Sequence, residues 1–153
     1  FPVTVLIVAL GSCLLQVFLP NKAKTVVFII YQLCILAVTL LRKQSDYGKS
    51  LVLFWSYRNF FINNLYRLEI LNNIWLFVPL GAGQYKRADA MYVFLYGACL
   101  SLLIEGMQYA LNLGFFEWDD IISNIVGTIM GYYIVFTLVC VFEGKRRKEN
   151  LKL

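Results

Sequence analysis

Four polar residues lie in or beside stretches of this chain that are apolar enough to cross a membrane: Glu105, Gln108, Asp120 and Asn124. A carboxyl group in hydrocarbon costs about 2.5–3.5 kcal/mol on insertion scales, so it is retained where it is paired, faces a wet cavity or performs a function. Carboxyl and amide groups together can bind a polar head group, exchange protons or hold an ion. The sequence therefore predicts a membrane protein with a polar centre.

The polar residues of the 90–111 stretch recur at intervals of three or four, in the order Gly97, Ser101, Glu105, Gln108 and Asn112. On a helix this spacing places them on one stripe. A polar stripe within a membrane must face protein or water, because lipid tails satisfy no hydrogen bond. We therefore expect the stripe to face the interior of a helical bundle.

The 121–142 stretch repeats this pattern with Asp120, Asn124, Gly127 or Thr128, and Gly131. Glycines four residues apart let two helix backbones approach closely. We expect Gly127 and Gly131 to pack on the 90–111 helix beside Gly97 and Ser101, which would bring the two polar stripes together. Asp120 lies near the expected start of its helix, where it is also a candidate N-cap.

Five apolar segments are available to position these residues: 3–19, 25–41, 70–83, 90–111 and 121–142. A helix needs about 20 residues to cross a bilayer. The 70–83 segment is short, so we expect it to borrow upstream residues or to lie tilted and kinked at Pro79, which removes a helix hydrogen bond. Broken helices of this kind often border binding sites, here with Asn73 and Gly81 nearby.

Residues 51–69 combine aromatic and polar positions at helical spacing, with Arg58 and Arg67 on the polar face. This pattern is typical of a helix that lies in the membrane interface. The predicted fold is an all-α polytopic bundle with about five transmembrane helices plus one interfacial amphipathic helix. It forms a single domain over residues 1–153.

The composition supports a membrane class. The chain is 60% apolar and 15% charged, whereas soluble proteins are about 25% charged. It has no histidine, and its four cysteines lie in four different apolar segments. We therefore expect no metal site, no cofactor and no catalysis that needs imidazole.

Basic residues are concentrated at the C-terminus, where Lys145, Arg146, Arg147, Lys148 and Lys152 fall in the last nine residues. After an apolar helix, such a run indicates a cytoplasmic tail that touches anionic membrane lipid rather than nucleic acid. With five spans, the side of the bilayer that holds this 143–153 tail carries nine basic residues and the opposite side five. This bias favours an outside N-terminus and a cytoplasmic C-terminus.

Each candidate also has a purely structural interpretation. Glu105 could pair with Arg58 or Arg67 and lock the bundle. Gln108 and Asn124 could form only interhelical hydrogen bonds, which contribute about 0.6 kcal/mol each.

Three motifs in series resemble the VanZ-like membrane family. Residues 73–81 match N-x-x-x-F-x-P-x-G, residues 101–108 match S-x-x-x-E-x-x-Q, and residues 119–131 match D-D-x-x-x-N-x-x-G-x-x-x-G. The resemblance covers 73–131 and assigns Asn73, Ser101 and Asp119 to the polar centre beside the residues above. It departs from the family at 114–116, where an expected Arg is missing, and at Glu117, which stands where an Asp is usual.

The resemblance implies a bacterial cytoplasmic-membrane protein of a family named for low-level teicoplanin resistance. If the missing Arg helps to hold an anionic ligand, Arg58 or Arg67 would have to replace it. The first functional hypothesis is a non-enzymatic protein that binds a lipid-linked cell-wall precursor or a lipophilic glycopeptide in its polar pocket. The alternatives are a small membrane enzyme, in which two carboxyl groups act as acid and base, or an ion-coupled transporter, which at five spans would work as a homodimer.

Overall fold

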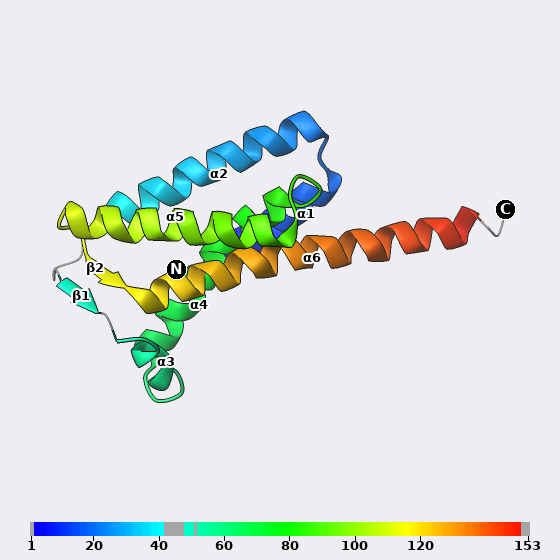
Figure 1. Cartoon of the computed structure of the whole chain (residues 1–153). Coiled ribbons are helices and arrows are strands. Elements are labelled where there is room, and N and C mark those ends of the chain that lie inside the picture. The colour runs from blue at the N-terminus through cyan, green and yellow to red at the C-terminus, as the bar shows by residue number, and fades with distance from the viewer. Residues whose placement is uncertain (1, 42–47, 51, 151–153) are drawn as a thin grey trace.

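The structure is a computed structural model in which residues 2–41, 48–50 and 52–150 are described, with the side chains of 3–40 and 52–144. Its elements, in chain order (Figure 1), are α1 (Pro2–Phe18), α2 (Asn21–Leu41), β1 (Gly48–Ser50), α3 (Trp55–Arg58), α4 (Asn64–Gln84), α5 (Ala90–Ala110), β2 (Phe115–Glu117) and α6 (Trp118–Asn150). The all-α prediction is confirmed apart from the two short strands. These pair in parallel, with Gly48 opposite Phe115 and Ser50 opposite Glu117.

Within the part of the chain that the structure describes, three helices are long and apolar enough to cross a membrane, namely α2 over Asn21–Leu40, α5 over Ala90–Ala110 and α6 over Trp118–Gly144. A shorter apolar helix, Val3–Phe18, lies within α1. The 70–83 segment does borrow upstream residues, because α4 has 21 residues and begins at Asn64. Polar residues in its first half set α4 apart from the three apolar helices.

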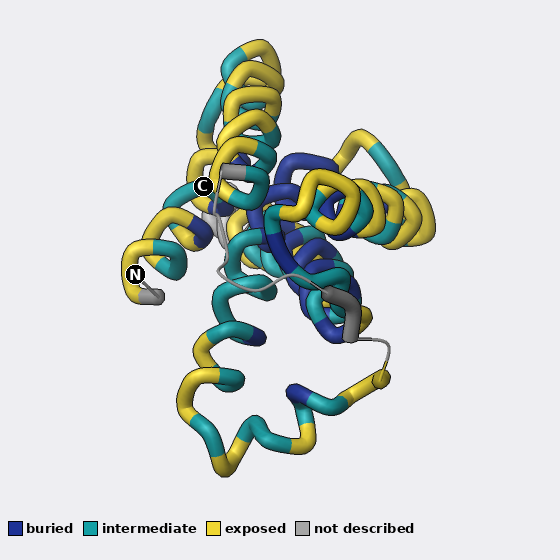
Figure 2. Tube along the Cα trace, turned by 90° about the vertical axis from the view of Figure 1, so that its left-hand side faces the viewer, coloured by how far each residue is buried: buried dark blue, intermediate teal, exposed yellow. Residues whose placement is uncertain are grey.

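Helix α4 occupies the centre of the bundle and contacts α1, α2, α5 and α6. All residues from Phe77 to Gln84 are buried, and the buried segments gather where the helices meet (Figure 2). One core cluster joins Ala9 and Cys13 to Val78, and another joins Phe77 and Leu80 to neighbouring helices. The outward faces of the surrounding helices carry exposed apolar side chains, as expected for a surface that contacts lipid.

Gly127 and Gly131 of α6 pack against α4, so the predicted packing of these two glycines on α5 is wrong. A Cβ added at Gly131 would lie 1.8 Å from the carbonyl oxygen of Val78, and one at Gly127 would lie 2.1 Å from that of Ile74. Helix α4 supplies a third glycine, Gly81, whose added Cβ would lie 1.6 Å from the carbonyl oxygen of Thr128. Small residues on both helices thus bring the backbones of α4 and α6 into direct contact, whereas Gly97 of α5 meets only a side chain of α6, that of Thr128.

Residues 51–69 do not form the single interfacial helix predicted from the sequence. Helix α3 has only four residues, and a separate helix begins after Asn63. The side chain of Asn63 accepts a hydrogen bond from the backbone N–H of Leu65 at 2.9 Å and so caps α4. The start of a second helix at this cap divides the amphipathic pattern into two helices.

Pro79 does not break its helix, because α4 continues on both sides of it. A proline cannot donate to the carbonyl four residues earlier, which here belongs to Trp75. Beside it, the carbonyl of Leu76 accepts a hydrogen bond from the Tyr31 hydroxyl at 2.8 Å. The polar backbone near Pro79 is therefore satisfied partly by α2, and the expected broken helix is not formed.

Helix α6 extends beyond the other helices at its C-terminal end (Figure 1). Much of the predicted 143–153 tail is therefore helical, up to Asn150. The basic side chains of 145–148, together with Lys152, lie outside the residues whose side chains are described.

Candidate functional site

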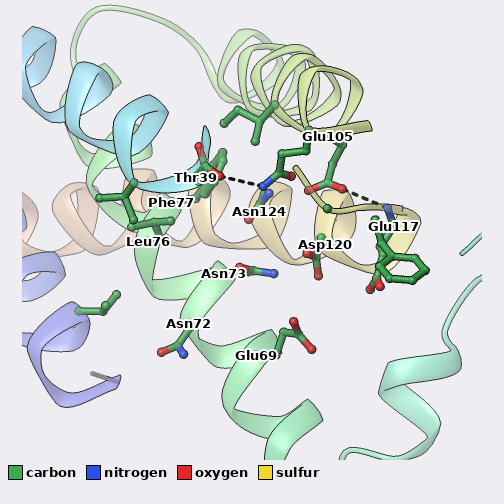
Figure 3. A pocket seen from close by; sticks show the side chains of 16 residues that line it. Thr39, Glu69, Asn72, Asn73, Leu76, Phe77, Glu105, Glu117, Asp120 and Asn124 are labelled. Carbon is green, nitrogen blue, oxygen red and sulfur yellow. Dashed lines mark hydrogen bonds between the residues drawn. The ribbon is translucent and has the colours of Figure 1, made fainter. Parts of the chain in front are cut away.

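A cavity of about 100 Å³ lies at the end of the bundle where α4 and α6 begin and α2 and α5 end. The polar side chains around it (Figure 3) are those of Thr39, Glu69, Asn72, Asn73, Glu105, Gln108, Glu117, Asp120 and Asn124. Two polar stripes predicted from the sequence, one on α5 and one on α6, thus meet around one space. Helix α4 adds a third polar face.

Glu105 is only 3% exposed and lies on the inner face of α5. Its Oε2 accepts a hydrogen bond from the backbone N–H of Glu117 at 3.1 Å. That contact joins α5 to β2 across the tight turn after the helix, where Asn112 adopts a left-handed φ of 55°. Asn112 thus lies beyond the helix and is exposed, rather than completing the α5 stripe.

No arginine or lysine lines the cavity among the residues that the structure describes. Glu105 forms no ion pair with Arg58 or Arg67, so the structural interpretation of Glu105 as their partner is wrong. Arg67 instead donates from Nη2 to Asn64 Oδ1 on its own helix, and Arg58 lies in α3 outside the cavity lining. Neither arginine therefore replaces the missing family Arg at this cavity.

Asn124 is 4% exposed and joins α6 to α5, because its Nδ2 donates to the Ser101 hydroxyl at 2.8 Å. Its Oδ1 is buried and has no hydrogen-bond partner in the described part of the chain. A buried acceptor without a partner costs about 1–3 kcal/mol. Since Asn124 lines the cavity, a ligand with a hydrogen-bond donor would satisfy this oxygen.

Gln108 extends the site to α2. Its Nε2 donates to the backbone carbonyl oxygen of Thr39 at 3.0 Å. This bond fixes the last turn of α2 against α5 and places Thr39 at the cavity. The sequence offered no signal for Thr39, because a single threonine in an apolar helix commonly bonds to its own preceding turn.

Asp119 and Asp120 point to different neighbours. Helix α6 begins at Trp118, so Asp120 lies in the first turn, favourable for the helix dipole, and not at the N-cap. Asp120 lines the cavity. Asp119 is 1% exposed and is bound to the backbone N–H of Phe54 at 2.6 Å and of Ser56 at 2.9 Å, which places it outside the cavity lining.

Two carboxyl groups at the cavity, Glu69 and Glu117, were not predicted as site residues. Glu69 comes from the segment interpreted as an interfacial helix, and Glu117 from the loop position where the resembled family usually has an Asp. Burial raises the pKa of Glu117 above its usual value, and the nearby carboxyl groups of Glu69 and Asp119 raise it further. With Glu105 and Asp120, four acidic side chains surround the space.

This arrangement is rich in hydrogen-bond acceptors. Carboxyl and amide oxygens face a small space with no basic side chain among the described residues. Such a set matches the donors of an ammonium group better than the oxygens of a phosphate, which need basic or N–H donors. The described residues contain no cluster of three or more His, Cys, Asp or Glu that could hold a metal ion.

An apolar groove of about 230 Å³ adjoins the cavity. The groove runs between α1 and α2 and is lined by residues that include Tyr31 and Ile35. Val5, Val38 and Leu76 line both the groove and the polar cavity. A polar space and an apolar one therefore lie side by side at this end of the bundle and share these three residues as a wall.

The VanZ/LLP1 family model matches residues 28–140, which is well over half of the chain. The chain belongs to the VanZ/LLP1 family. The match begins within α2 and ends within α6, so it includes every polar residue around the cavity. No curated protein and no solved structure matches the chain.

Proposed function

We propose that this VanZ/LLP1 protein binds an amphiphile that carries an amine, and so protects the bacterial envelope against lipophilic cell-wall-targeting antibiotics of the teicoplanin type. The observation that carries the proposal is that the acidic cavity adjoins the apolar groove, because both are lined by Val5, Val38 and Leu76. The cavity would hold the charged head, and the groove would hold part of the apolar tail.

The acidity of the cavity favours a cationic head group. Four carboxyl groups, from Glu69, Glu105, Glu117 and Asp120, line it without a neighbouring lysine or arginine in the described chain. The unsatisfied Oδ1 of Asn124 adds an acceptor. The pyrophosphate of a lipid-linked cell-wall precursor would be repelled by these groups, so we favour the amphiphile over the precursor.

The size of the cavity restricts what enters it. Its volume of about 100 Å³ equals the space of about three waters, whereas pockets for drug-sized ligands span about 300–1,000 Å³. A primary ammonium group fits such a space, but an entire glycopeptide does not. The remainder of the ligand would stay in the groove and in the surrounding lipid.

The bilayer arrangement is part of the proposal. Helices α1 and α4 would complete a set of five passes with the three long apolar helices. An outside N-terminus would then place the acidic cavity at the outer face and the basic end of α6 in the cytoplasm. A ligand from the outer leaflet would reach the cavity without crossing the membrane.

Binding to the purified full-length chain in nonionic detergent tests the proposal, with dodecylammonium as the probe and dodecanol as its neutral counterpart. We expect tighter binding of dodecylammonium. Glu105→Gln should weaken it by tenfold or more, because hydrogen bonds to charged groups contribute about 1.5–3 kcal/mol. Arg67→Gln removes a charge at the same end but outside the cavity, so it should bind as the parent does.

Cells that express these chains at equal membrane abundance test the physiological half of the proposal. The parent and Arg67→Gln should reduce susceptibility to teicoplanin, and Glu105→Gln should not. Equal protection by parent and Glu105→Gln would refute the role of the cavity. Chemical conversion of an added lipid substrate, lost in Asp120→Asn, would instead establish the alternative of a membrane enzyme.

A further inference from the structure

A second cavity, of about 800 Å³, opens at the opposite end of the bundle. It lies where α1 meets α2 and where α4 leads into α5, beside α6. Its lining residues are Gln16, Val17, Phe18, Asn21, Lys24, Thr25, Ala82, Tyr85, Lys86, Arg87, Val139, Phe142 and Glu143. This cavity shares no lining residue with the acidic one.

The charges of the second cavity are mainly positive. Lys24, Lys86 and Arg87 line it together with a single acid, Glu143. Lys86 Nζ lies 3.4 Å from Glu143 Oε1, and both side chains are largely exposed, at 65% and 70%. This exposed ion pair leaves Lys24 and Arg87 as cations without a partner acid among the described residues.

Arg87 is exposed, and two contacts orient its guanidinium group. Its Nη2 donates to the Thr25 hydroxyl at 2.8 Å, and its guanidinium lies 5.7 Å from the centre of the Phe28 ring. A guanidinium has five N–H donors in a rigid plane that matches the geometry of a phosphate group. The contact with Thr25 uses one of these N–H donors. The Phe28 ring orients the guanidinium plane without using any donor.

The inner wall supplies a second feature of a ligand site. Gln16 lies on α1, is only 7% exposed and lines the cavity. Around it, Val17, Ala82 and Val139 form an apolar wall. A buried amide on an apolar wall beneath a cationic rim suits a ligand with a phosphate, polar linkages and hydrocarbon.

The rim of the cavity combines an uncommon backbone turn with an aromatic cluster, and the cluster is typical of a membrane interface. Lys86 adopts a left-handed φ of 64°, which is uncommon for a residue with a side chain and which directs the turn between α4 and α5. Tyr85 packs edge-on against the rings of Tyr132 and Phe136, at 6.0 and 6.2 Å. Tyrosine clusters of this kind are enriched where hydrocarbon meets water.

From this combination we infer that the second cavity binds the phosphate head group of an anionic membrane lipid. Basic cavities between transmembrane helices bind such head groups in other proteins. The cavity lies at the same end of the bundle as the basic run 145–148. Bound lipid would tie α1 and α2 to the α4–α5 turn, all of which contribute to its wall.

Binding of three short-chain probes to the full chain in nonionic detergent tests the inference: dioctanoyl phosphatidylglycerol, dioctanoyl phosphatidylcholine and glycerol 3-phosphate. We expect the anionic lipid to bind more tightly than the other two. Arg87→Gln and Lys24→Gln should each weaken its binding about fivefold, since one basic residue near a membrane surface contributes about that factor. Lys22→Gln, at the same end but outside the lining, should bind as the parent does.

Three results would overturn the inference. Equal binding of the anionic and zwitterionic lipids would show that the charge of the head group does not determine binding. An equal loss of lipid binding in Lys22→Gln and Arg87→Gln would show that the lipid does not bind in this cavity. Binding of glycerol 3-phosphate as tight as that of the lipid would assign the site to a soluble phosphate compound. Dodecylammonium binding should be unchanged in Arg87→Gln, so failure here is distinguishable from failure of the proposed function.

Discussion

The carboxyl group of Asp119 accepts hydrogen bonds from both the backbone N–H and the hydroxyl of Ser56, 63 residues earlier in the chain. It also accepts from the backbone N–H of Phe54. Phe54 is the N-cap of α3, has a left-handed φ of 62° and forms no capping bond with its own side chain. Asp119 therefore caps α3 from another helix and holds the 54–58 turn against the first turn of α6.

We predict that Asp119→Ala destabilises the chain by about 3 kcal/mol, because it leaves buried N–H and hydroxyl donors without their acceptor. Ser56→Ala removes one of the three bonds and should cost about 1 kcal/mol. Thermal unfolding in detergent measures both. Ser12→Ala, whose hydroxyl bonds only to Val8 on its own helix, serves as the control and should change stability by less than about 0.5 kcal/mol.

Gly131→Ala should prevent normal packing of α6 on α4. Its new Cβ would lie 1.8 Å from the carbonyl oxygen of Val78, so the backbones must separate. Overpacking that moves backbone costs about 1–3 kcal/mol and occasionally more, and we expect the upper end here because the neighbour is a backbone atom. Gly106→Ala is the matched control, because no heavy atom lies within 4 Å of its added Cβ. A Gly131→Ala chain that purifies and melts like Gly106→Ala would contradict the close approach of the two helices.

Variants of Ser101 and Asn124 distinguish an effect on the stability of the chain from an effect on ligand binding. Ser101→Ala alone should cost about 1–3 kcal/mol, because it removes the partner of the buried Asn124 Nδ2. The double variant Ser101→Ala/Asn124→Leu replaces both partners by apolar groups, so it should restore the stability of the parent. It should nevertheless lose dodecylammonium binding, because the unpaired Oδ1 is gone. Parent-like binding by the double variant would exclude that oxygen from the ligand site.

The stability of the chain should fall as pH rises through the raised pKa of Glu117. Burial favours the neutral form of this carboxyl group in the folded state. Its contribution is therefore complete below its unfolded pKa of about 4.3 and is lost above its folded pKa. Glu117→Gln keeps the neutral shape at every pH, so it should be more stable than the parent at about pH 8 and similar at about pH 4. Unfolding temperatures of both chains across this range measure the effect, and a parent advantage that grows with pH would contradict it.

The sequence by itself determined the class of the protein and most of its polar centre. Hydropathy, the spacing of Ser101, Glu105 and Gln108, and the position of Asn124 are local properties of the chain, and they predicted one buried stripe on each of two helices. These stripes do meet at one cavity. The VanZ-like motifs also agree with the family match over residues 28–140.

Only the tertiary structure decided which helix faces which. Neighbouring residues on a helix differ by about 100° in direction, so Gly127 faces α4 while Thr128 faces Gly97 of α5. In the same way, Asp119 turns to α3 and Asp120 to the cavity. These directions depend on the rotation and crossing of helices distant in sequence, which the packing of all side chains sets together. The same global packing places Glu69 and Glu117 at the cavity and leaves Arg58 and Arg67 outside it.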